Sequence, residues 1–162
     1  MSIAATIVRL EGAGKLRRYE PRLRRPLRRR LYLAGAAMRD FDSRSSAVNT
    51  LVGKGFVEGA LTRWVSGGRI YGDQNRGLFL DKLSSPPPEV WEIRVTEPVV
   101  QARLFARFAE PDTLILTGFH TRGHLGKKGS QNWIEAMQAC KECWDELFPG
   151  MHPLQDLVFT PM

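Results

Sequence analysis

The stretch "EVWEIRVTEPVVQARLFARFAEPDTLILTGFH", residues 89–120, contains three apolar segments separated by two short turns. Apolar residues alternate with charged ones through residues 89–95 and 99–110, whereas residues 113–120 form an almost continuous apolar run. Alternation is typical of a strand with one buried face, and a continuous run is typical of a strand buried on both faces. The stretch therefore predicts three consecutive antiparallel strands with turns at "TEP" and "EPD".

The middle strand of this trio carries an unusual set of side chains. Because side chains alternate along a strand, Arg103, Phe105 and Arg107 should share the face opposite Leu104 and Ala106. Two cations and an aromatic ring would then lie side by side on a cation-lined sheet face. The alternative for Arg103, and for Arg94 on the preceding strand, is a cross-strand ion pair with Glu92, Glu97 or Glu110.

Helical patterns flank the three strands. After them, "WIEAMQACKECWDELF" (133–148) predicts a helix capped by Ser130 or Asn132 and stopped by Pro149 and Gly150. Before them, residues 20–41 place apolar side chains at spacings of three and four, and residues 42–66 do the same. These two segments predict an antiparallel helical hairpin. The β-branched residues at 3–10 predict one further strand.

These elements together predict an α+β fold, in which an N-terminal strand and a helical hairpin pack on a small antiparallel sheet with a C-terminal helix. A length of 162 residues fits one domain. We expect a basic N-terminal segment over residues 1–19, one domain over 20–150 with the hairpin at 20–66 and the sheet and last helix at 78–148, and a tail at 151–162. The sequence lacks a long apolar run and a signal-peptide pattern, so we expect a cytoplasmic protein.

Positive charge is concentrated at the N-terminus. Residues 1–30 hold ten Lys and Arg against two Glu, a net charge of +8 in a chain whose total is +7. Clustered arginines bind phosphates well, because the guanidinium is planar and always charged. We expect this segment to bind RNA through Arg24, Arg25, Arg28 and Arg29. An acidic protein partner and a plain solvated surface remain the alternatives.

The loop after the third strand gathers titratable and basic side chains. His120 ends the strand, and Arg122, His124, Lys127 and Lys128 follow before the next helix. Histidine exchanges protons near neutral pH, whereas arginine and lysine bind phosphate. Each residue also has an ordinary structural reading, as a strand-end packing residue or a solvated loop side chain. The two cysteines, Cys140 and Cys143, suggest reduced thiols, and we expect no metal and no cofactor.

Three segments resemble RelE/HigB-type mRNA interferases, in particular phage-derived RelE-like proteins. They are "VWEIRV", "ARLFARF", and "ILTGFH" with the later lysine pair and the helix that contains "WIEAM"; the resemblance covers roughly residues 78–147. This chain departs from the family's Gly-Phe-x-Lys-Lys pattern by having Thr121 and Arg122 at the two lysine positions after Gly118-Phe119-His120, with its own lysine pair, Lys127 and Lys128, further on. The resemblance implies a toxin of a toxin–antitoxin system that cleaves mRNA on the ribosome, and a cognate antitoxin that masks its site.

Metal-independent RNA cleavage requires a base for the ribose 2′-OH, an acid for the leaving 5′-oxygen, and cations for the charge that builds on the phosphate. We therefore expect catalytic roles for the set His120, His124, Arg94, Arg103, Arg122 and Lys128, and RNA contacts from Phe105, Arg107 and Lys127. His120 is the better base candidate, because a strand end fixes its direction. Two further readings remain open, a non-catalytic RNA- or ribosome-binding protein of phage or prophage type and a protein that binds only an acidic partner.

Overall fold

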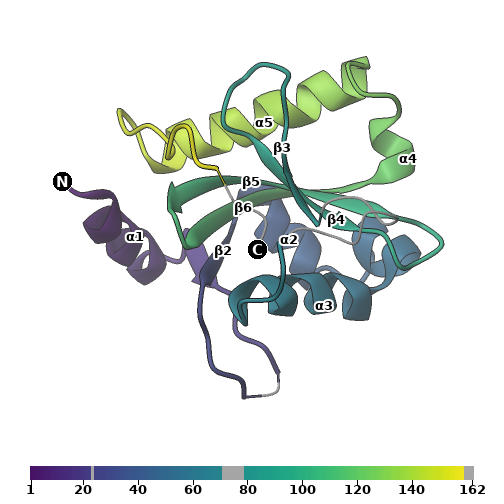
Figure 1. Ribbon diagram of the computed structural model, residues 1–162, viewed down its shortest axis with the longest axis horizontal. Helices are drawn as coiled ribbons and strands as arrows, with labels where there is room; N and C mark the ends of the chain where they lie inside the picture. The colour runs from purple at the N-terminus through teal and green to yellow at the C-terminus, as the bar shows by residue number, and fades with distance from the viewer. Residues whose placement is uncertain (23, 71–78, 159–162) are drawn as a thin grey trace.

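A mixed six-stranded sheet lies between two helical layers (Figure 1). The computed structural model describes residues 1–22, 24–70 and 79–158. In chain order its elements are α1 (Ile3–Gly12), β1 (Leu16–Arg18), β2 (Arg30–Ala34), α2 (Gly35–Asp42), the π-helical segment η1 (Val48–Gly53), α3 (Lys54–Val65), β3 (Leu80–Lys82), β4 (Trp91–Val95), β5 (Ala102–Glu110), β6 (Thr113–Thr121), α4 (Arg122–Leu125) and α5 (Gln131–Leu147).

The strands lie in the order β1-β2-β6-β5-β4-β3. All neighbours are antiparallel except β2 and β6, which run parallel with Arg30 opposite Thr113 and Leu33 opposite Leu116. The α+β class is therefore confirmed, whereas the sheet is mixed and larger than the expected antiparallel one. After β2 the chain forms the helical layer of α2, η1 and α3, and then the strands β3, β4, β5 and β6. The last of these strands, β6, pairs with β2.

The three central strands of the prediction are confirmed as β4, β5 and β6. The pairing of β5 with β6 shifts register twice, between Phe105 and Ala106 and between Phe108 and Glu110, and the first shift lies near the end of β6. Phe105 lies opposite Gly118 but Ala106 lies opposite Leu116, so Thr117 is an extra residue in β6. The Thr117 hydroxyl donates to the Phe105 carbonyl oxygen at 3.3 Å. Such a bulge bends a strand and redirects the side chains beyond it, here those at the end of β6.

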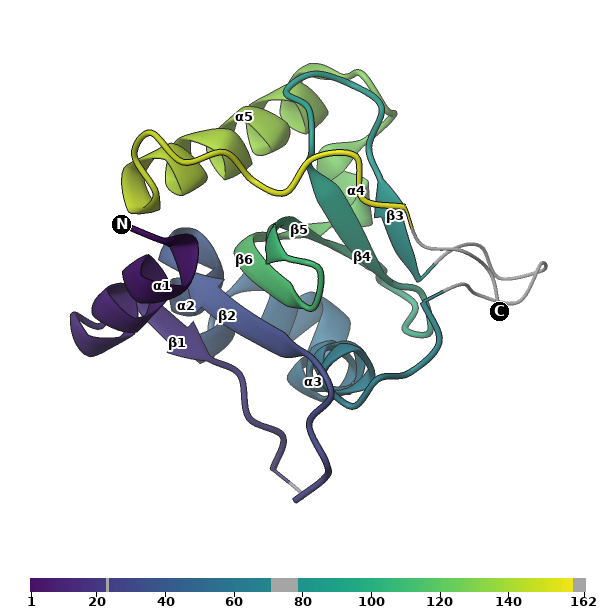
Figure 2. The same ribbon diagram turned by 60° about the vertical axis from the view of Figure 1, so that its left-hand side comes forward.

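The sheet is buried on both faces. On one face, residues such as Leu33, Leu104 and Phe108 pack against Leu61 and Trp64 of α3 in the largest apolar cluster. The opposite face is covered by α1 and α5 in two smaller clusters, which Figure 2 shows from a second side. Trp91, Trp133 and Trp144 belong to this core and are at most 5% exposed. Burial on both faces explains why β5 and β6 contain so few exposed positions.

The expected strand over residues 3–10 is wrong, because these residues form helix α1. Ser2 caps it, since its side-chain oxygen accepts from the Ala5 amide at 3.1 Å. The buried side chains Thr6, Ile7 and Leu10 follow helical spacing and cover the sheet edge at β1 and β2. The β-branched composition favours a strand. The N-capping serine and the single buried row of side chains at helical spacing stabilise a helix instead.

The expected helix over residues 20–41 is also wrong. The segment contains strand β2 and an extended stretch before it, and only Gly35–Asp42 is helical. Pro21 and Pro26 disfavour a continuous helix. Leu31 and Leu33 face the helical layer, whereas Tyr32 faces α1. The apolar spacing that resembles the buried stripe of a helix therefore belongs to a strand that is buried on both faces. Its hydrogen-bonding partner β6 lies some eighty residues later, and local spacing contains no information on that pairing.

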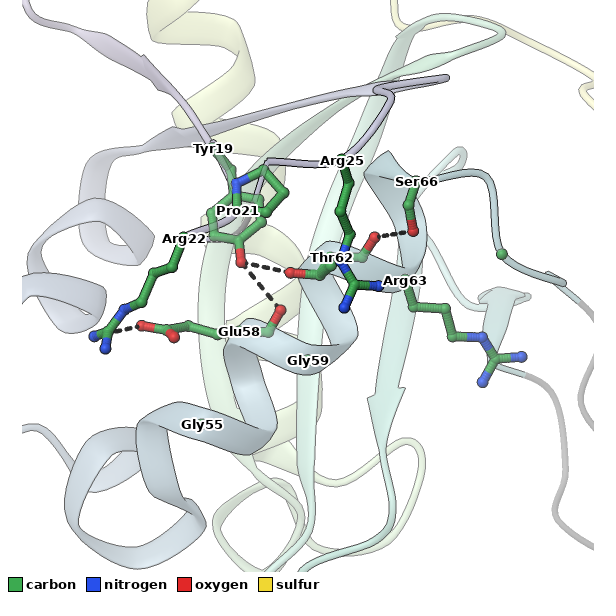
Figure 3. Close-up of a pocket in the computed structure, with 11 residues that line it drawn as sticks. Tyr19, Pro21, Arg22, Arg25, Gly55, Glu58, Gly59, Thr62, Arg63 and Ser66 are labelled. Carbon is green, nitrogen blue, oxygen red and sulfur yellow. Dashed lines mark hydrogen bonds and ion pairs between the residues drawn. The ribbon is translucent and has the colours of Figure 1, made fainter.

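The connection from β1 to β2, described over residues 19–22 and 24–29, contacts α3 near both of its ends. The Tyr19 hydroxyl is 3.1 Å from the Glu58 carbonyl oxygen, to which it donates, and 2.8 Å from the Thr62 hydroxyl (Figure 3). Arg22 forms an ion pair with the Glu58 carboxylate at 3.2 Å. The segment is therefore a loop anchored on α3, and its arginines project from a loop and not from a helix.

The second predicted helix, residues 42–66, is confirmed from Val48 onward as η1 followed by α3. Gly53 has φ of 104°, and this backbone conformation separates the two helical segments. The C-terminal helix is confirmed as α5, with Ser130 as its N-cap. The short β3 and α4 were not predicted. Part of the long connection before β3, residues 71–78, lies outside the described residues.

The residues after α5 return to the sheet. The Leu154 amide donates to the Phe108 carbonyl oxygen at 2.8 Å, and the Asp156 amide donates to Glu89 at 3.4 Å. Residues 151–158, expected to be a tail, therefore pack against the protein. Within the described ranges, no helix is long and apolar enough to cross a membrane.

Candidate functional site

Six side-chain positions form a grid on the α5-facing side of β4, β5 and β6. The outer row consists of Arg94, Arg103 and His120, which are direct cross-strand neighbours. The inner row consists of Glu92, Phe105 and Gly118, in the same register. Three of the residues predicted to be catalytic thus come from three separate strands and meet at one end of the sheet.

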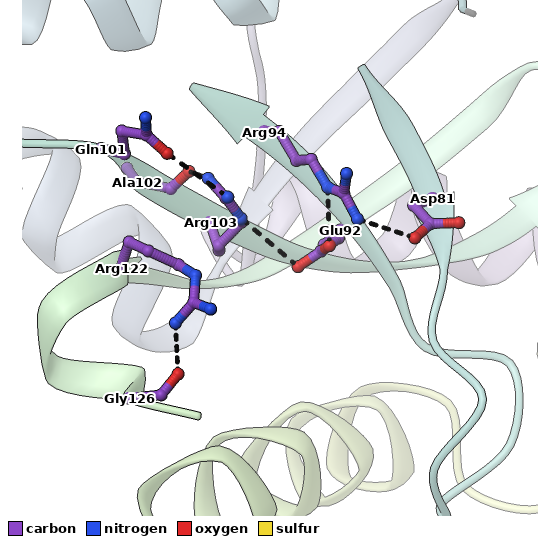
Figure 4. Close-up of polar contacts among 8 residues, drawn as sticks. All are labelled: Asp81, Glu92, Arg94, Gln101, Ala102, Arg103, Arg122 and Gly126. Atoms are coloured by element: carbon purple, nitrogen blue, oxygen red, sulfur yellow. Dashed lines mark hydrogen bonds and ion pairs between the residues drawn. The ribbon is translucent and has the colours of Figure 1, made fainter. Parts of the chain in front are cut away.

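Carboxylates hold the two arginines of the outer row (Figure 4). Glu92 accepts from the Arg94 Nε at 2.9 Å, and its other oxygen lies 3.8 Å from the Arg103 Nε. Arg94 also donates to Asp81 of β3 at 2.9 Å. The Glu92 side chain is fully buried; its Oε1 accepts the hydrogen bond from Arg94, and its Oε2 has the ion pair with Arg103 but no hydrogen bond. The expected cross-strand ion pair with Glu92 is therefore confirmed for Arg103, whereas Arg94 pairs with Glu92 within β4 and crosses to Asp81 of β3 instead.

Arg103 is held from a second side as well. Its Nη1 donates to the Ala102 carbonyl oxygen at 3.0 Å, and its Nη2 donates to the Gln101 side chain at 3.4 Å. The residue is 9% exposed, and burial lowers the pKa of its guanidinium while Glu92 opposes that change. An arginine fixed by this many partners has lost most of its rotational freedom before any ligand arrives.

His120 lies back along its own strand over Gly118. Its ring centroid is 5.0 Å from that of Phe105, and a Cβ placed on Gly118 would be 2.8 Å from the His120 Nε2. Burial, with a smaller contribution from His124, lowers the pKa of His120 to about 4. The imidazole is therefore neutral at pH 7 and can accept a proton. Gly118 is the residue that makes room for it.

The loop after β6 places further cations beside this row. Arg122 begins α4, donates to the Gly126 carbonyl oxygen, and lies with its guanidinium carbon 5.5 Å from the Trp133 ring centroid. The Lys128 ammonium is 5.9 Å from the same centroid. His124, Lys127 and Lys128 are exposed. The predicted loop residues and the predicted strand residues thus belong to one surface.

The expected open sheet face is wrong for two of its residues. Phe105 is fully buried, with its ring centroid 5.7 Å from that of Trp133, and Arg107 is 4% exposed. Helix α5 covers both, because its apolar side packs across β5. Arg107 donates to the Pro88 carbonyl oxygen at 2.6 Å, and burial lowers the pKa of its guanidinium. Neither side chain is presented to RNA in this conformation; only the strand ends remain accessible.

The N-terminal arginines lie at the other end of the sheet. Arg30 pairs with Thr113, the first residue of β6, whereas His120 is close to its last residue. Seven residues of strand separate the two positions by roughly 23 Å. Arg24, Arg25 and Arg28 are exposed. The structure therefore divides the predicted site residues into two separate surfaces.

Arg29 differs from its neighbours because it packs against the end of α3. Its Nη1 donates to the Trp64 and Gly68 carbonyl oxygens at 3.3 and 3.2 Å, and its guanidinium carbon lies 4.5 Å from the Trp64 ring centroid. Burial lowers the pKa of this guanidinium. A cation at a helix C-terminus stabilises the helix, so the role of Arg29 in this structure is to stabilise α3.

Arg29→Ala is expected to lower the free energy of unfolding by about 1.5–3 kcal/mol, because charged hydrogen bonds to two carbonyls are lost. Urea denaturation measures the change. Arg24→Ala is the matched control, since Arg24 is exposed, and it should change the value by less than about 0.5 kcal/mol. Equal effects of the two substitutions would contradict the structural role of Arg29.

Gly118→Ala is expected to raise the pKa of His120 from about 4 toward the ordinary value near 6.5, because the added methyl displaces the imidazole from its buried position. NMR titration of the imidazole protons measures the pKa directly. In the wild type, the unfolded chain binds this proton below about pH 6.5 and the folded chain only near pH 4, so the group lowers stability as pH falls across that window.

Gly123→Ala is the control for the Gly118 substitution. No atom lies within 4 Å of a Cβ placed on Gly123, which belongs to α4, so the His120 pKa should not change. An unchanged His120 pKa in Gly118→Ala would contradict the positioning role of Gly118.

Sequence reasoning missed Glu92 and Gly118 as members of the site. Glu92 was considered only as an ion-pair partner, and alternation along β4, which places it on the same face as Arg94, was the available signal. Gly118 had no such signal, because its role depends on how His120 folds back. In the described parts of the chain, no three His, Cys, Asp or Glu side chains form a group that could hold a metal ion, and both cysteines are free thiols.

Comparison with known proteins gives no assignment: no family model, no curated protein and no solved structure matches this chain.

Proposed function

We propose that this protein is a metal-independent endoribonuclease of the RelE/HigB type that cleaves mRNA on the ribosome. The observation that supports the proposal most is the outer row, in which Arg94, Arg103 and a neutral His120 are direct neighbours on three strands. The order of elements from β2 onward, strand, helical layer, meander and helix, also agrees with the fold that the resemblance implies. This second support is an analogy of fold, and the row of side chains is the stronger one.

The chemistry assigned to the row is an in-line transesterification. His120 accepts the proton of the ribose 2′-OH, and the resulting oxygen forms a bond to the adjacent phosphorus. The bond from phosphorus to the 5′-oxygen breaks, and that oxygen takes a proton from His124, which is exposed and close enough to affect the His120 pKa. The products are a 2′,3′-cyclic phosphate and a free 5′-hydroxyl.

Cations around the row stabilise the negative charge of the transition state. The row and the loop beside it carry five positive charges, and the carboxylates of Asp81 and Glu92 carry two negative ones, so three formal positive charges remain for a phosphate. The five cations are Arg94, Arg103, Arg122, Lys127 and Lys128. Arg103 is held in place before the substrate binds, and preorganised donors of this kind contribute the largest share in many enzymes. Arg122, Lys127 and Lys128 extend the positive surface toward the rest of the RNA.

One observation favours a non-catalytic RNA- or ribosome-binding protein as the second candidate. Arg94 already binds two carboxylates, those of Glu92 and Asp81, and such pairing lowers its availability for a phosphate. A surface with this pairing can still attract RNA through the exposed loop lysines. The two candidates predict equal binding and differ only in cleavage.

The deciding experiment adds the purified protein to translating ribosomes and maps the ends of the mRNA. We expect cuts with 2′,3′-cyclic phosphate ends, unchanged by EDTA, and arrest of growth on induced expression that a cognate antitoxin relieves. Ribosome binding with uncut mRNA would establish the non-catalytic candidate. Intact mRNA together with no ribosome binding would refute both.

A further inference from the structure

A cavity of about 540 Å³ lies where the ends of α1 and α5 meet the start of α2. Figure 2 shows these parts of the three helices together on its left-hand side. The lining residues come from α1, the turn after it, α2 and the C-terminal end of α5, and none of them belongs to the His120 row. Small-molecule sites typically have volumes of about 300–1,000 Å³, so this cavity can hold a small ligand.

The wall of the cavity is largely aliphatic. Leu10 and Leu147 line it and belong to the apolar cluster in which α1 packs against α5. Met38 lines it as well, and a flexible thioether adapts to the shape of a ligand. None of the described residues that form the wall carries an aromatic ring, so the cavity offers no surface on which a nucleic-acid base could stack.

The thiol of Cys143 completes the apolar part of the wall. Gly35 has φ of 49°, and a Cβ placed on it would lie 3.1 Å from the Cys143 Sγ, so the thiol packs directly on the backbone at the start of α2. Burial raises the pKa of the Cys143 thiol to about 11. The group is therefore protonated at neutral pH, and a protonated thiol behaves as a small apolar group.

The charged side chains of the cavity are mostly cationic. Arg9, Lys15 and Arg39 line it, all three are exposed, and none of their side chains has a hydrogen bond or an ion pair with another described residue. Glu146 is the one carboxylate among the lining residues, whose net charge is therefore +2. The helix dipoles oppose one another, because α2 begins at the cavity whereas α1 and α5 end there. Arginine and lysine have donors and no acceptor, so the complementary head group is an anion.

We propose that this cavity binds a small anion with an aliphatic body, such as a medium-chain carboxylate or phosphate monoester. The head group contacts the cations, and the chain lies against Leu10, Met38 and Leu147. A purely hydrophilic anion would leave the apolar wall in contact with water, and a neutral lipid would leave the cations without a partner. The inference does not depend on the proposed nuclease activity.

Isothermal titration calorimetry of the full chain with octanoate, below the concentration at which it forms micelles, measures the binding. Acetate has the same head group without the chain, and octylammonium has the chain with the opposite charge. We expect both to bind at least about tenfold more weakly than octanoate. Octyl phosphate is titrated in the same way, and the tighter of the two octyl anions identifies the head group that the cations prefer.

Two variants test the two parts of the site. Arg39→Gln removes a cation and Ala13→Phe fills the cavity, and each should weaken octanoate binding by about tenfold. Arg44→Gln and Ala5→Phe are the matched controls, because neither residue lines the cavity. All four residues are exposed, so the variants should melt close to the wild type. His120→Ala should bind octanoate as the wild type does, which distinguishes failure here from failure of the nuclease proposal.

Labelling of the thiols with N-ethylmaleimide at mildly alkaline pH locates the bound ligand. Cys140 is 2% exposed, whereas Cys143 lines the cavity, so peptide mapping of the folded protein should find the label on Cys143. Saturating octanoate should slow this labelling several-fold. Arg39→Gln should remove the protection at the same octanoate concentration.

Three results would overturn the inference. Octanoate that does not bind, or that binds wild type, Arg39→Gln and Ala13→Phe equally, shows that the cavity has no such ligand. Octylammonium that binds as tightly as octanoate shows that the cations do not select the head group. Unchanged labelling of Cys143 at saturating octanoate places the bound anion elsewhere on the protein.

Discussion

His120→Ala is expected to reduce mRNA cleavage on ribosomes by about 10²–10⁴-fold, because the substitution removes the base that accepts the 2′-OH proton. Ribosome binding should be retained, since the loop cations remain. The measurement is the rate of appearance of 2′,3′-cyclic phosphate ends at saturating protein.

The pH dependence of the same reaction follows from the His120 pKa of about 4. The neutral imidazole is the active form of a base, so the contribution of this group to the rate rises as pH increases through 4 and is constant from there to neutral pH. His152→Ala is the matched control, because His152 is exposed on the C-terminal segment, far along the chain from the row. Full activity of folded His120→Ala would refute the assignment of His120 as the base.

Glu92→Ala is expected to lower the free energy of unfolding by about 3–5 kcal/mol, the typical cost of removing one partner of a buried ion pair. The Glu92 side chain is fully buried and lies between the guanidiniums of Arg94 and Arg103. Without the carboxylate, two cations on adjacent strands repel each other at reduced solvation. Urea denaturation followed by circular dichroism gives the change.

Glu135→Ala is the control for Glu92→Ala. Glu135 is exposed on α5 and accepts a hydrogen bond from Gln131 at 3.0 Å, so its loss should change stability by less than about 0.5 kcal/mol. A small effect of Glu92→Ala, comparable with that of Glu135→Ala, would show that the arginines do not need this counterion.

The sequence predicted well those elements whose patterns are local. Helix α5 has a capping serine, an amphipathic run and a Pro-Gly stop, and β4 to β6 are consecutive strands with short turns. Two predictions of element type were wrong: residues 30–34 were predicted as helix and form a strand, and residues 3–10 were predicted as strand and form a helix. The sequence pattern of a strand buried on both faces resembles that of an amphipathic helix, and a helix rich in β-branched residues resembles a strand in composition.

The same difference between local sequence pattern and long-range contact applies to the candidate site. Alternation along the strands predicted that Arg94, Arg103 and His120 occupy strand positions near a loop rich in cations, and residue chemistry suggested what they do. Only the register of β4, β5 and β6 made these three direct neighbours, and only the packing of α5 closed the face over Phe105 and Arg107.

The sequence by itself therefore determined the α+β class, the meander, the last helix and the kinds of side chain that the two surfaces carry. These properties depend on short-range periodicity and composition, which a strand or helix expresses wherever it lies. The tertiary structure decided the parallel pairing of β2 with β6, the burial of Glu92 between two arginines, the low pKa of His120 over Gly118, and the distance between the His120 row and the N-terminal arginines. Each of these depends on contacts between residues far apart in the chain, and their energies come from burial and register that no local pattern encodes.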